Sequence, residues 1–458
     1  MQKTKTVAKS EGEGILFRGM RAYISLMLNK FLFSSVEVEG LENLPPVGTP
    51  TLLVGNHQNG LIDPLMVIST LSDRKVHIFT RGGVFRKSEH LSRWARQLGM
   101  IPAYRLNREG LEMVKENRQI MTETGRLMMN GATVLIYPEG THAERCHLGE
   151  FSAAGLRMAF DAAAEQGFDK EVIVVPVGVH YDNYYGLRNR MLLRFGQSIS
   201  LSQYYPSYAE RPRTTANTVT RLVRDAVCSL VLDIADNHYD AYESLCISRM
   251  QVPSVLTIGS EPDQSLSQQL DADRNVMRNL EDAYADCDKM IEENEEYVSL
   301  LSRYKTSDCA IDYANHHLVF FFVAILCLLL LPIGIVSLWP SGLAWALSKR
   351  MAIKSGYRCF ANLYLVSLGG MLIIPLLCTL TAVGIALNVG FIPMMVYLAM
   401  QPVQILFAWY YWDTARLLRQ MANYMYLPQN NRSDLYRRHL RLSALKGEIH
   451  NEMEFTVI

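Results

Sequence analysis

Residues 50–65 read PTLLVGNHQNGLIDPL, and this stretch holds the features that decide the fold. Its first part, residues 51–54, is a short apolar run with β-branched members, which predicts a buried strand. The strand would lead His57 into a loop. The pair Asp63 and Pro64 then predicts a helix start, with Asp63 as the N-cap and Pro64 at the first helical position.

A histidine after a strand and a carboxylate at a helix start make a candidate acid–base pair. Asp63 could accept a hydrogen bond from one ring nitrogen of His57, and the other nitrogen could then take a proton from a substrate. The same residues are also consistent with an ordinary turn that ends in an N-cap aspartate. Both interpretations are open on this stretch alone.

Composition limits what the chain can be. Its 458 residues exceed one ordinary domain, so two or more parts are expected. The 45 basic and 45 acidic residues balance, which argues against a protein that coats nucleic acid. The eight cysteines are scattered without a CxxC pair or a His/Cys cluster. This pattern predicts reduced thiols and no metal site.

Strands and helices are expected to alternate in the first half of the chain. Strands are predicted at 36–40, 51–54, 76–80, 133–137 and 172–179, and helices at 89–98, 111–130 and 155–166. Such alternation predicts an α/β fold with a largely buried sheet flanked by helices. Functional loops cluster at strand ends in these folds, and His57, Arg105 and Glu139 all fall there.

Three more short blocks accompany the His57-to-Asp63 stretch: GMIPAYR at 99–105, YPEGT at 137–141 and VVPV at 174–177. In this order the four pieces resemble the signature blocks of the glycerolipid acyltransferases, the superfamily of lysophosphatidate and glycerol-3-phosphate acyltransferases. The resemblance covers roughly the region from the first predicted strand to the last. It implies the α/β sheet of that superfamily.

The resemblance also implies an activity and roles for residues. The enzyme would transfer a fatty acyl group from acyl-CoA or acyl-carrier protein to a hydroxyl of glycerol-3-phosphate or 1-acylglycerol-3-phosphate, in phosphatidic acid and phospholipid synthesis. His57 would be the general base and Asp63 its orienting partner. The binding site for the phosphorylated acceptor would be formed by Arg105, Glu139, Gly140, Thr141 and Arg145. Neither a metal nor a cofactor is implied beyond the donor thioester.

Elementary chemistry agrees with these roles. The pKa of an alcohol lies far above 7, so an acceptor hydroxyl needs a base, and an oriented histidine contributes a rate factor of ~10²–10⁴. Arg105 offers a fork of donors for a phosphate, and Gly140 and Thr141 offer backbone N–H groups. A carboxylate repels phosphate, so Glu139 would orient a cation or bond an acceptor hydroxyl.

Two departures from the superfamily pattern are present. Five residues, Gln58 to Ile62, separate the His and the Asp, where the superfamily usually has four. This longer spacing, with His142 and Arg145 after the Pro-Glu-Gly block, resembles the branch acting on glycerol-3-phosphate or dihydroxyacetone phosphate. A lysine usual in the superfamily is missing from residues 151–155, FSAAG. A non-catalytic, membrane-anchored lipid-binding or scaffold protein with the same fold is therefore the alternative.

Apolarity changes along the chain and suggests five parts. These are an amphipathic N-terminal helix at 1–35, the acyltransferase domain at 36–212, a helical spacer or cap at 213–317, a membrane region at 318–412 and a basic cytosolic tail at 413–458. The N-terminal run contains charged residues and no cleavage site, so it is not expected to be a signal peptide. A helix on the membrane surface and a first helix packed on the core are both consistent with it. The spacer shows no residues with an evident chemical role.

The membrane region holds three uncharged segments, at 318–339, 362–387 and 391–412. Three full spans would put the basic residues of 349–358 outside, against the tendency of basic loops to stay in the cytosol. Pro332 permits instead two half-helices, 318–331 and 341–347, in a re-entrant hairpin. We expect an integral membrane protein in contact with membrane lipids, its catalytic domain on the cytoplasmic face. Three full spans remain the alternative.

Overall fold

The structure is a computed structural model. It describes residues 15–60, 62–86, 88–104, 111–140, 146–182, 188–234, 265–283, 287–314, 316–356 and 364–454. The chain divides into two compact units. The first comprises Met1–Lys30, Val36–His180 and Met191–Asp233, and the second comprises Phe31–Ser35, Tyr181–Arg190 and Ile234–Ile458.

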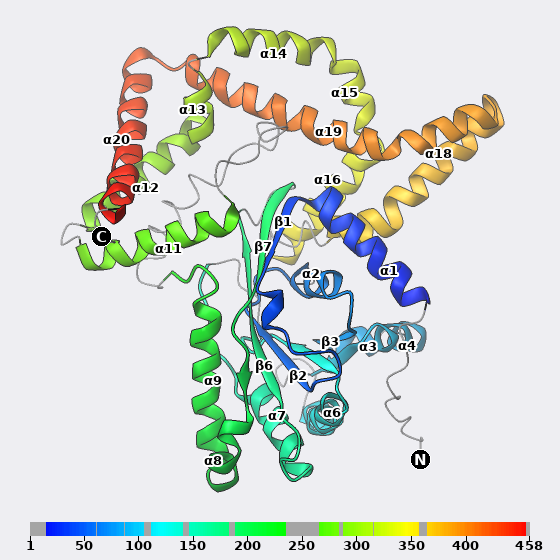
Figure 1. The fold of residues 1–458 in the computed structure, drawn as a ribbon. Coiled ribbons are helices and arrows are strands. Elements are labelled where there is room, and N and C mark those ends of the chain that lie inside the picture. The colour runs from blue at the N-terminus through cyan, green and yellow to red at the C-terminus, as the bar shows by residue number, and fades with distance from the viewer. Residues whose placement is uncertain are drawn as a thin grey trace. The chain divides into compact units, whose positions relative to one another are not determined.

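A mixed sheet organises the first half of the chain (Figure 1). In the described residues its strands are β1 (Phe33–Glu39), β2 (Thr51–Gly55), β3 (Val76–Arg81), β4 (Met100–Ala103), β5 (Thr133–Ile136), β6 (Ile173–Tyr181), β7 (Asn189–Phe195) and β8 (Ile199–Ser200). Their order is β1-β7-β6-β2-β5-β3-β4, with β8 paired to β6. β2 lies between β5 and β6 and is parallel to both. The predicted α/β sheet is therefore confirmed, and β7 and β8 extend it.

Helices cover both faces of the sheet. Those of the first unit are α1 (Ile15–Leu26), α2 (Ile62–Thr70), α3 (Gly83–Arg86), α4 (Glu89–Gln97), α6 (Leu111–Met129), α7 (Ala154–Glu165), α8 (Tyr205–Glu210) and α9 (Pro212–Cys228). Crossovers between parallel strands are right-handed. The steps β2–β3 and β3–β4 run towards one edge, while β4–β5 and β5–β6 run back. Helices α2 and α4 thus lie on one face, and α6 and α7 on the other.

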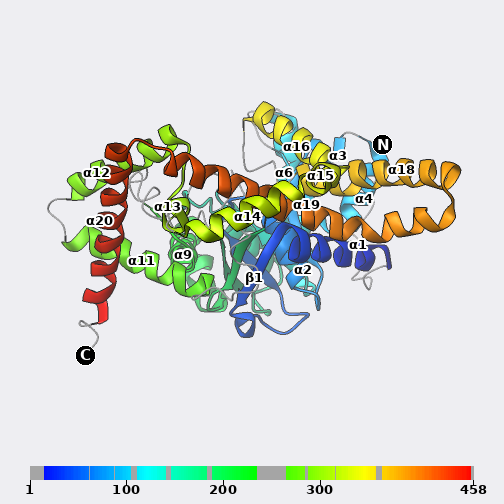
Figure 2. The same cartoon turned by 90° about the horizontal axis from the view of Figure 1, so that it is seen from above.

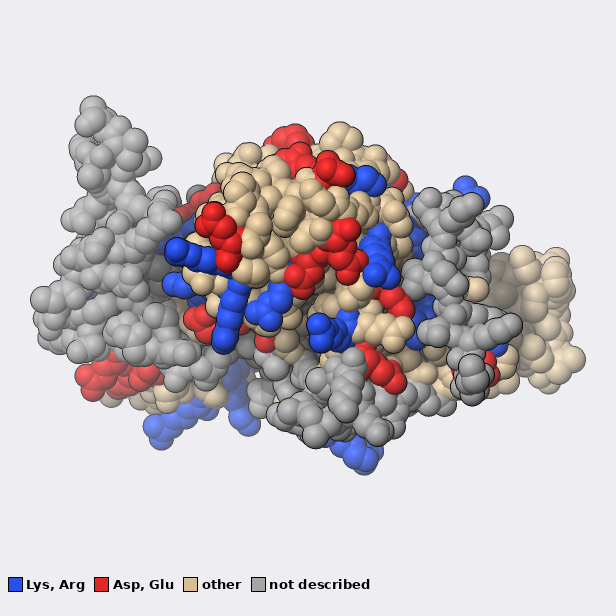
Figure 3. Space-filling view, turned by 90° about the horizontal axis from the view of Figure 1, so that it is seen from below, with Lys and Arg blue, Asp and Glu red and all other residues tan. Residues whose placement is uncertain are grey.

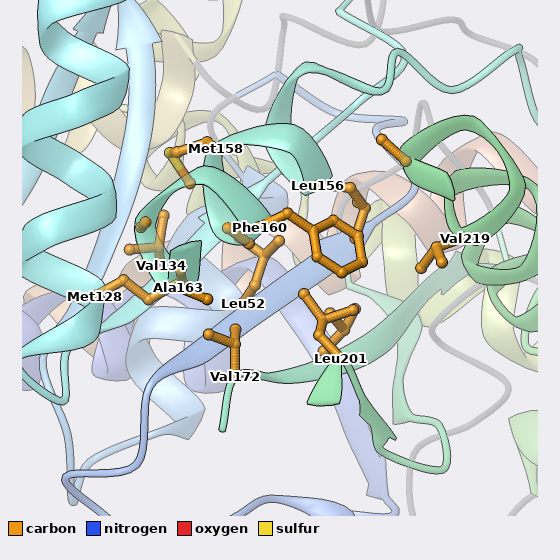
Figure 4. Packing of buried hydrophobic residues seen from close by; sticks show 14 of the residues in the cluster. Leu52, Met128, Val134, Leu156, Met158, Phe160, Ala163, Val172, Leu201 and Val219 are labelled. Atoms are coloured by element: carbon orange, nitrogen blue, oxygen red, sulfur yellow. The ribbon is translucent and has the colours of Figure 1, made fainter. Parts of the chain in front are cut away.

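The main core lies between the sheet and α6, α7, α8 and α9. Phe160 is fully buried at its centre, among Leu52, Leu156 and Leu201 (Figure 4). Burying a side chain of this size contributes roughly 1.5–3 kcal/mol, so the cluster is a main source of stability. Helix α9 belongs to this core through Val219. The sequence had placed α9 in the spacer that begins at 213, because its polar face dominates its composition.

Helix α1 packs on α2 within the first unit. This contact agrees with packing on the core, while the alternative of a helix on the membrane surface stays a prediction. A π-helical turn, Met27–Leu32, follows α1. On the face of the molecule drawn in Figure 3, acidic and basic side chains are interspersed. That mixture matches the balanced composition of the chain.

The second unit is helical. Its described helices are α11 (Leu266–Ala283), α12 (Cys287–Tyr304), α13 (Asp308–Ala314), α14 (His317–Leu329), α15 (Leu331–Ser337), α16 (Ser341–Ser355), α18 (Ile374–Asn388), α19 (Phe391–Met425) and α20 (Gln429–Glu454), with a π-helical segment at Leu365–Ile373. Two stretches, Leu368–Asn388 and Phe391–Met425, are long and apolar enough to cross a membrane. Helices α18 and α19 run side by side (Figure 2).

Two bent helix pairs add to these candidates for spans. Helices α13 and α14 meet at 109°, and α15 and α16 meet at 60°. The break before α15 falls at Leu330, and Pro332 lies in the first turn of α15, so the chain breaks just before the predicted point. Helix α16 continues to Ser355, beyond the predicted end at 347, because long basic side chains are good helix formers. Helix α19 likewise continues past the predicted boundary at 412.

Side chains of α19 satisfy backbone carbonyls near these breaks. The Tyr411 hydroxyl donates to Cys327 O at 2.8 Å, and Trp412 Nε1 donates to Gly334 O at 3.2 Å. Gln404 Nε2 donates to Val336 O at 3.3 Å. Carbonyls that lose their helical partners are tolerated at membrane depth only where protein satisfies them. The contacts therefore make the broken segment compatible with a membrane interior.

Candidate active site

The register of two parallel strands brings His57 and Glu139 together. Val54 of β2 pairs with Ile136 of β5, and each of the two side chains lies three residues further along its strand direction. The carboxyl ends of parallel strands meet at one edge of the sheet, where ligands bind in α/β folds. The backbone N–H of His57 donates to Glu139 Oε1 at 2.8 Å. Two of the predicted residues are thus in direct contact.

Asp63 holds the ring of His57. Its Oδ2 lies 2.9 Å from His57 Nδ1, and it also accepts the backbone N–H groups of Gln58 and Asn59, each at 2.8 Å. A carboxylate accepts hydrogen bonds, so Nδ1 carries the ring proton and Nε2 carries the lone pair. The Asp63 side chain is completely buried, whereas that of His57 is 18% exposed. The pair thus has a buried orienting end and an accessible base.

The start of helix α2 differs from the prediction. Helix α2 begins at Ile62, so Asp63 lies inside its first turn and is not the N-cap. Its carboxylate turns back to the loop before the helix and binds that loop and the imidazole. The start of the loop after His57, at Gln58 and Asn59, is therefore organised around one carboxylate oxygen.

Glu139 connects two loops. Its Oε2 accepts the backbone N–H of Gly149 at 3.1 Å, while Oε1 accepts that of His57. Burial raises the pKa of the Glu139 carboxyl, although the two backbone hydrogen bonds oppose this effect. Both oxygens thus hold protein backbone, which the sequence did not indicate. The predicted contact of Glu139 with a cation or an acceptor hydroxyl stays a prediction.

Tyr137 covers the face of the His57 ring. The two rings stack with their centroids 4.2 Å apart and their planes at 15°. The Tyr137 hydroxyl is buried and has no hydrogen-bond partner among the described residues. Burial raises the pKa of Tyr137 well above its ordinary value, and the nearby charge of Asp63 adds to this. Tyr137 therefore contacts His57 through its ring and not through its hydroxyl.

Gly140 and Asn56 shape the backbone beside the pair. Gly140 has a φ of +66°, a conformation that favours glycine, and its N–H donates to Tyr137 O at 3.1 Å. Asn56 binds β6 with both ends of its amide, at Val179 O (2.9 Å) and Val179 N (2.8 Å). These contacts fix the points where the chain leaves β5 and β2. The predicted anion-binding role of the Gly140 amide stays a prediction.

Three predicted residues, Arg105, Thr141 and Arg145, lie outside the described residues. The strand that precedes Arg105, β4, is separated from β2 by β5 and β3. At the usual spacing this puts β4 and β2 ~14 Å apart. The described residues contain no group of three or more His, Cys, Asp or Glu side chains that could hold a metal ion.

Sequence reasoning missed Tyr137, Asn56 and Gly149 as parts of the site. Tyr137 and Asn56 stand inside the quoted blocks, and their positions directly after predicted strands were the available signal. Gly149 gave none, because its contact with Glu139 depends on the path of the loop between them.

Fold and geometry define a class of protein: an α/β domain with an oriented histidine at the carboxyl edge of its sheet, suited to general-base catalysis. Comparison with known proteins adds the family. Residues 35–180 match the Acyltransferase family model. These residues form a domain of the glycerolipid acyltransferase superfamily, as the sequence blocks predicted.

Part of the chain is also similar to individual proteins. Over 147 residues the chain is 31% identical to the chloroplastic 1-acyl-sn-glycerol-3-phosphate acyltransferase LPAT1 of Arabidopsis thaliana, covering 32% of this chain and 36% of the relative. It is also 31% identical to the corresponding enzyme BAT2 of Brassica napus, covering 32% and 37%. The chain thus spans little more than a third of the length of these relatives. A crystal structure of the acyltransferase PlsC from Thermotoga maritima is 22% identical, with a TM-score of 0.31, covering 45% of this chain and 81% of that one.

Proposed function

We propose that this protein is a membrane-bound O-acyltransferase. It transfers a fatty acyl group from acyl-CoA or acyl-carrier protein to the free hydroxyl of 1-acylglycerol-3-phosphate, with glycerol-3-phosphate as the second candidate acceptor. The contact of His57 Nδ1 with Asp63 at 2.9 Å, inside the matched family domain, is the observation that carries the proposal.

The geometry supports a direct transfer with a general base. His57 Nε2 takes the proton of the acceptor hydroxyl while that oxygen attacks the thioester carbonyl. Asp63 stabilises the imidazolium that forms, because its oxygen already accepts the Nδ1 proton. The tetrahedral intermediate then collapses, the C–S bond breaks, and the departing thiolate takes the proton from His57. An ester and a free thiol are the products, and no nucleophilic side chain is acylated.

A phosphorylated acceptor is proposed because of the blocks around Arg105, Thr141 and Arg145. The printed names of the relatives favour lysophosphatidate. The five-residue spacing after His57 favours the glycerol-3-phosphate branch. His142 and Arg145 after the Pro-Glu-Gly block favour the same branch as the spacing. We nevertheless place lysophosphatidate first, because the printed names of two relatives give it as the acceptor.

The test is a panel of acceptors presented to the purified protein in lipid vesicles, with a labelled acyl thioester as donor. Labelled phosphatidate formed from lysophosphatidate supports the proposal. Labelled lysophosphatidate formed from glycerol-3-phosphate would show that glycerol-3-phosphate is the acceptor instead. Saturable binding of these lipids without any transfer would instead favour the non-catalytic scaffold. The donors acyl-CoA and acyl-carrier protein are compared in parallel.

We also propose that the catalytic domain faces the cytoplasm and that the broken segment, α14 to α16, is re-entrant. Lys349, Arg350 and Lys354 lie in the last part of α16, and basic residues beside hydrophobic segments favour the cytosol. Single cysteines at 352 and 445, in a protein without its native cysteines, should resist an impermeant thiol reagent in intact cells and react after lysis. Labelling of both positions in intact cells would instead show full spans.

A further inference from the structure

Helix α9 holds a loop that continues the Pro-Glu-Gly-Thr block. Arg224 Nε donates to Gly149 O at 3.1 Å, and its Nη2 donates to Leu148 O at 2.8 Å. Arginine presents its donors in a rigid fork, which suits two successive carbonyls. Arg224 thus fixes two consecutive peptide units with a single side chain.

Asp233, which follows α9 in the chain, binds the same loop. Its Oδ1 accepts the backbone N–H of Leu148 at 2.8 Å and lies 3.0 Å from His147 Nδ1. Its Oδ2 accepts Cys228 Sγ at 3.4 Å. The backbone of Leu148 is therefore held at its N–H by Asp233 and at its carbonyl by Arg224. We call Arg224 and Asp233 the loop clamp.

The other side of the loop leads to the base. Gly149 N–H donates to Glu139 Oε2 at 3.1 Å, and Glu139 Oε1 accepts the His57 N–H at 2.8 Å. The fit is close, since a Cβ added at Gly149 would lie 3.2 Å from Glu139 Oε2. Hydrogen bonds thus run without interruption from Arg224 through Gly149 and Glu139 to the backbone of His57.

We propose that Arg224 and Asp233 are positioning residues, which hold the Leu148–Gly149 backbone so that Glu139 keeps the backbone of His57 in its catalytic place. The inference rests on the proposed acyl transfer for its consequence in turnover. It assigns a function to part of the chain that the sequence presented as a spacer without chemistry. The reacting atoms are touched by neither residue.

Turnover is the first readout. Loss of a hydrogen bond from a charged group costs about tenfold or more, so Arg224→Ala should lower kcat by ~10-fold or more. The KM for the acyl thioester should change by less than about threefold, because the clamp contacts loop backbone. The matched control is Arg221→Ala, an exposed arginine one turn earlier on α9, which should keep wild-type turnover. Equal turnover of Arg224→Ala and the control would overturn the proposal.

A double-mutant cycle tests the path. If Arg224 acts through Glu139, the combined Arg224→Ala and Glu139→Gln variant should lose much less turnover than the product of the two single losses, because the second change removes an already weakened link. Multiplicative losses would show that Arg224 acts elsewhere and would reject the path. A general loss of folding would also appear in the thermal unfolding of Arg224→Ala, and Arg224→Lys, which keeps one donor, should then recover part of the turnover.

Amide hydrogen exchange tests the clamp without any activity. Exchange in a peptide covering 146–152 should be faster in Arg224→Ala than in wild type and unchanged in Arg221→Ala. Unchanged exchange in Arg224→Ala would overturn the clamp even in an active enzyme. If the wild type transfers no acyl group to any acceptor, the proposed function fails, and faster exchange would still support the clamp itself.

Discussion

Two histidines, one in each unit, lie against aspartates and do different things. His57 meets Asp63 at Nδ1, and the lone pair is then left on Nε2. His439 of α20 meets a carboxylate at each ring nitrogen, Asp308 at Nδ1 and Asp312 at Nε2, both at 2.8 Å. The His439 side chain is also more buried, at 6% exposed against 18%.

The number of carboxylates decides the chemistry. Burial alone would lower the pKa of His439, but the hydrogen bonds that its ring donates to Asp308 and Asp312 outweigh burial and raise the pKa to about 9. Both nitrogens then carry protons at neutral pH, so His439 is a fixed cation that joins α13 to α20. A second carboxylate thus turns a potential base into a structural ion pair. The comparison teaches that a nearby aspartate alone does not identify a catalytic histidine.

The largest expected effect is on His57. His57→Ala should lower acyl transfer by about 10²-fold or more, the low end for loss of a general base, with unchanged membrane binding and thermal unfolding. His90→Ala, at an exposed position on α4, is the control and should stay active. Near-normal transfer by His57→Ala would show that His57 is not the general base and so does not differ from His439 in that respect.

The second effect is on stability and follows from His439. Its folded pKa of about 9 exceeds the ordinary 6.5, so its stabilisation is complete below pH 6.5 and is lost as the pH rises through about 9. The shift corresponds to about 3 kcal/mol. His439→Gln should therefore unfold more easily than wild type at pH 7 and approach it at pH 10, as measured by denaturant unfolding in detergent. The same stability difference at both pH values would contradict a charged His439.

The smallest expected effect concerns Tyr137, whose ring stacks on that of His57 with the centroids 4.2 Å apart. At His439 the ring centroids of Tyr436 and Tyr297 lie 6.3 and 6.4 Å away. A ring face stabilises a cation by ~0.5–2 kcal/mol, so Tyr137→Leu should lower kcat roughly 2- to 30-fold. Tyr137→Phe keeps the ring and removes a buried, unpaired hydroxyl, so it should keep the activity and at least the wild-type stability. A greater loss in Phe than in Leu would show that the hydroxyl is what matters.

The sequence predicted the sheet, and it predicted that His57 and Glu139 lie at the same edge of it. Both predictions rest on local patterns, because apolar runs mark the strands and the residues that follow parallel strands lie at one edge. It did not predict that the Asp63 carboxylate accepts hydrogen bonds from the preceding loop, because an N-cap pattern does not show which groups the carboxylate will contact. The position of α9 was missed for a similar reason, since the partners of Arg224 are backbone carbonyls that no residue type reveals. The His439 cluster joins two helices far apart in sequence, α13 and α20, and only the folded chain brings their side chains together.

Helix α19 has a mechanical consequence. It runs for 35 residues without a break in the helix, ~52 Å at the usual rise, whereas a bilayer core is ~30 Å thick. Its first charged residue is Asp413, so about the last third lies beyond the apolar part, where Leu417 and Met421 pack on Ala310 of α13. In a bilayer, the apolar part of α19 would lie in lipid while its last third stayed packed on α13. A change of bilayer thickness that altered the tilt of the helix would therefore also move the end that packs on α13.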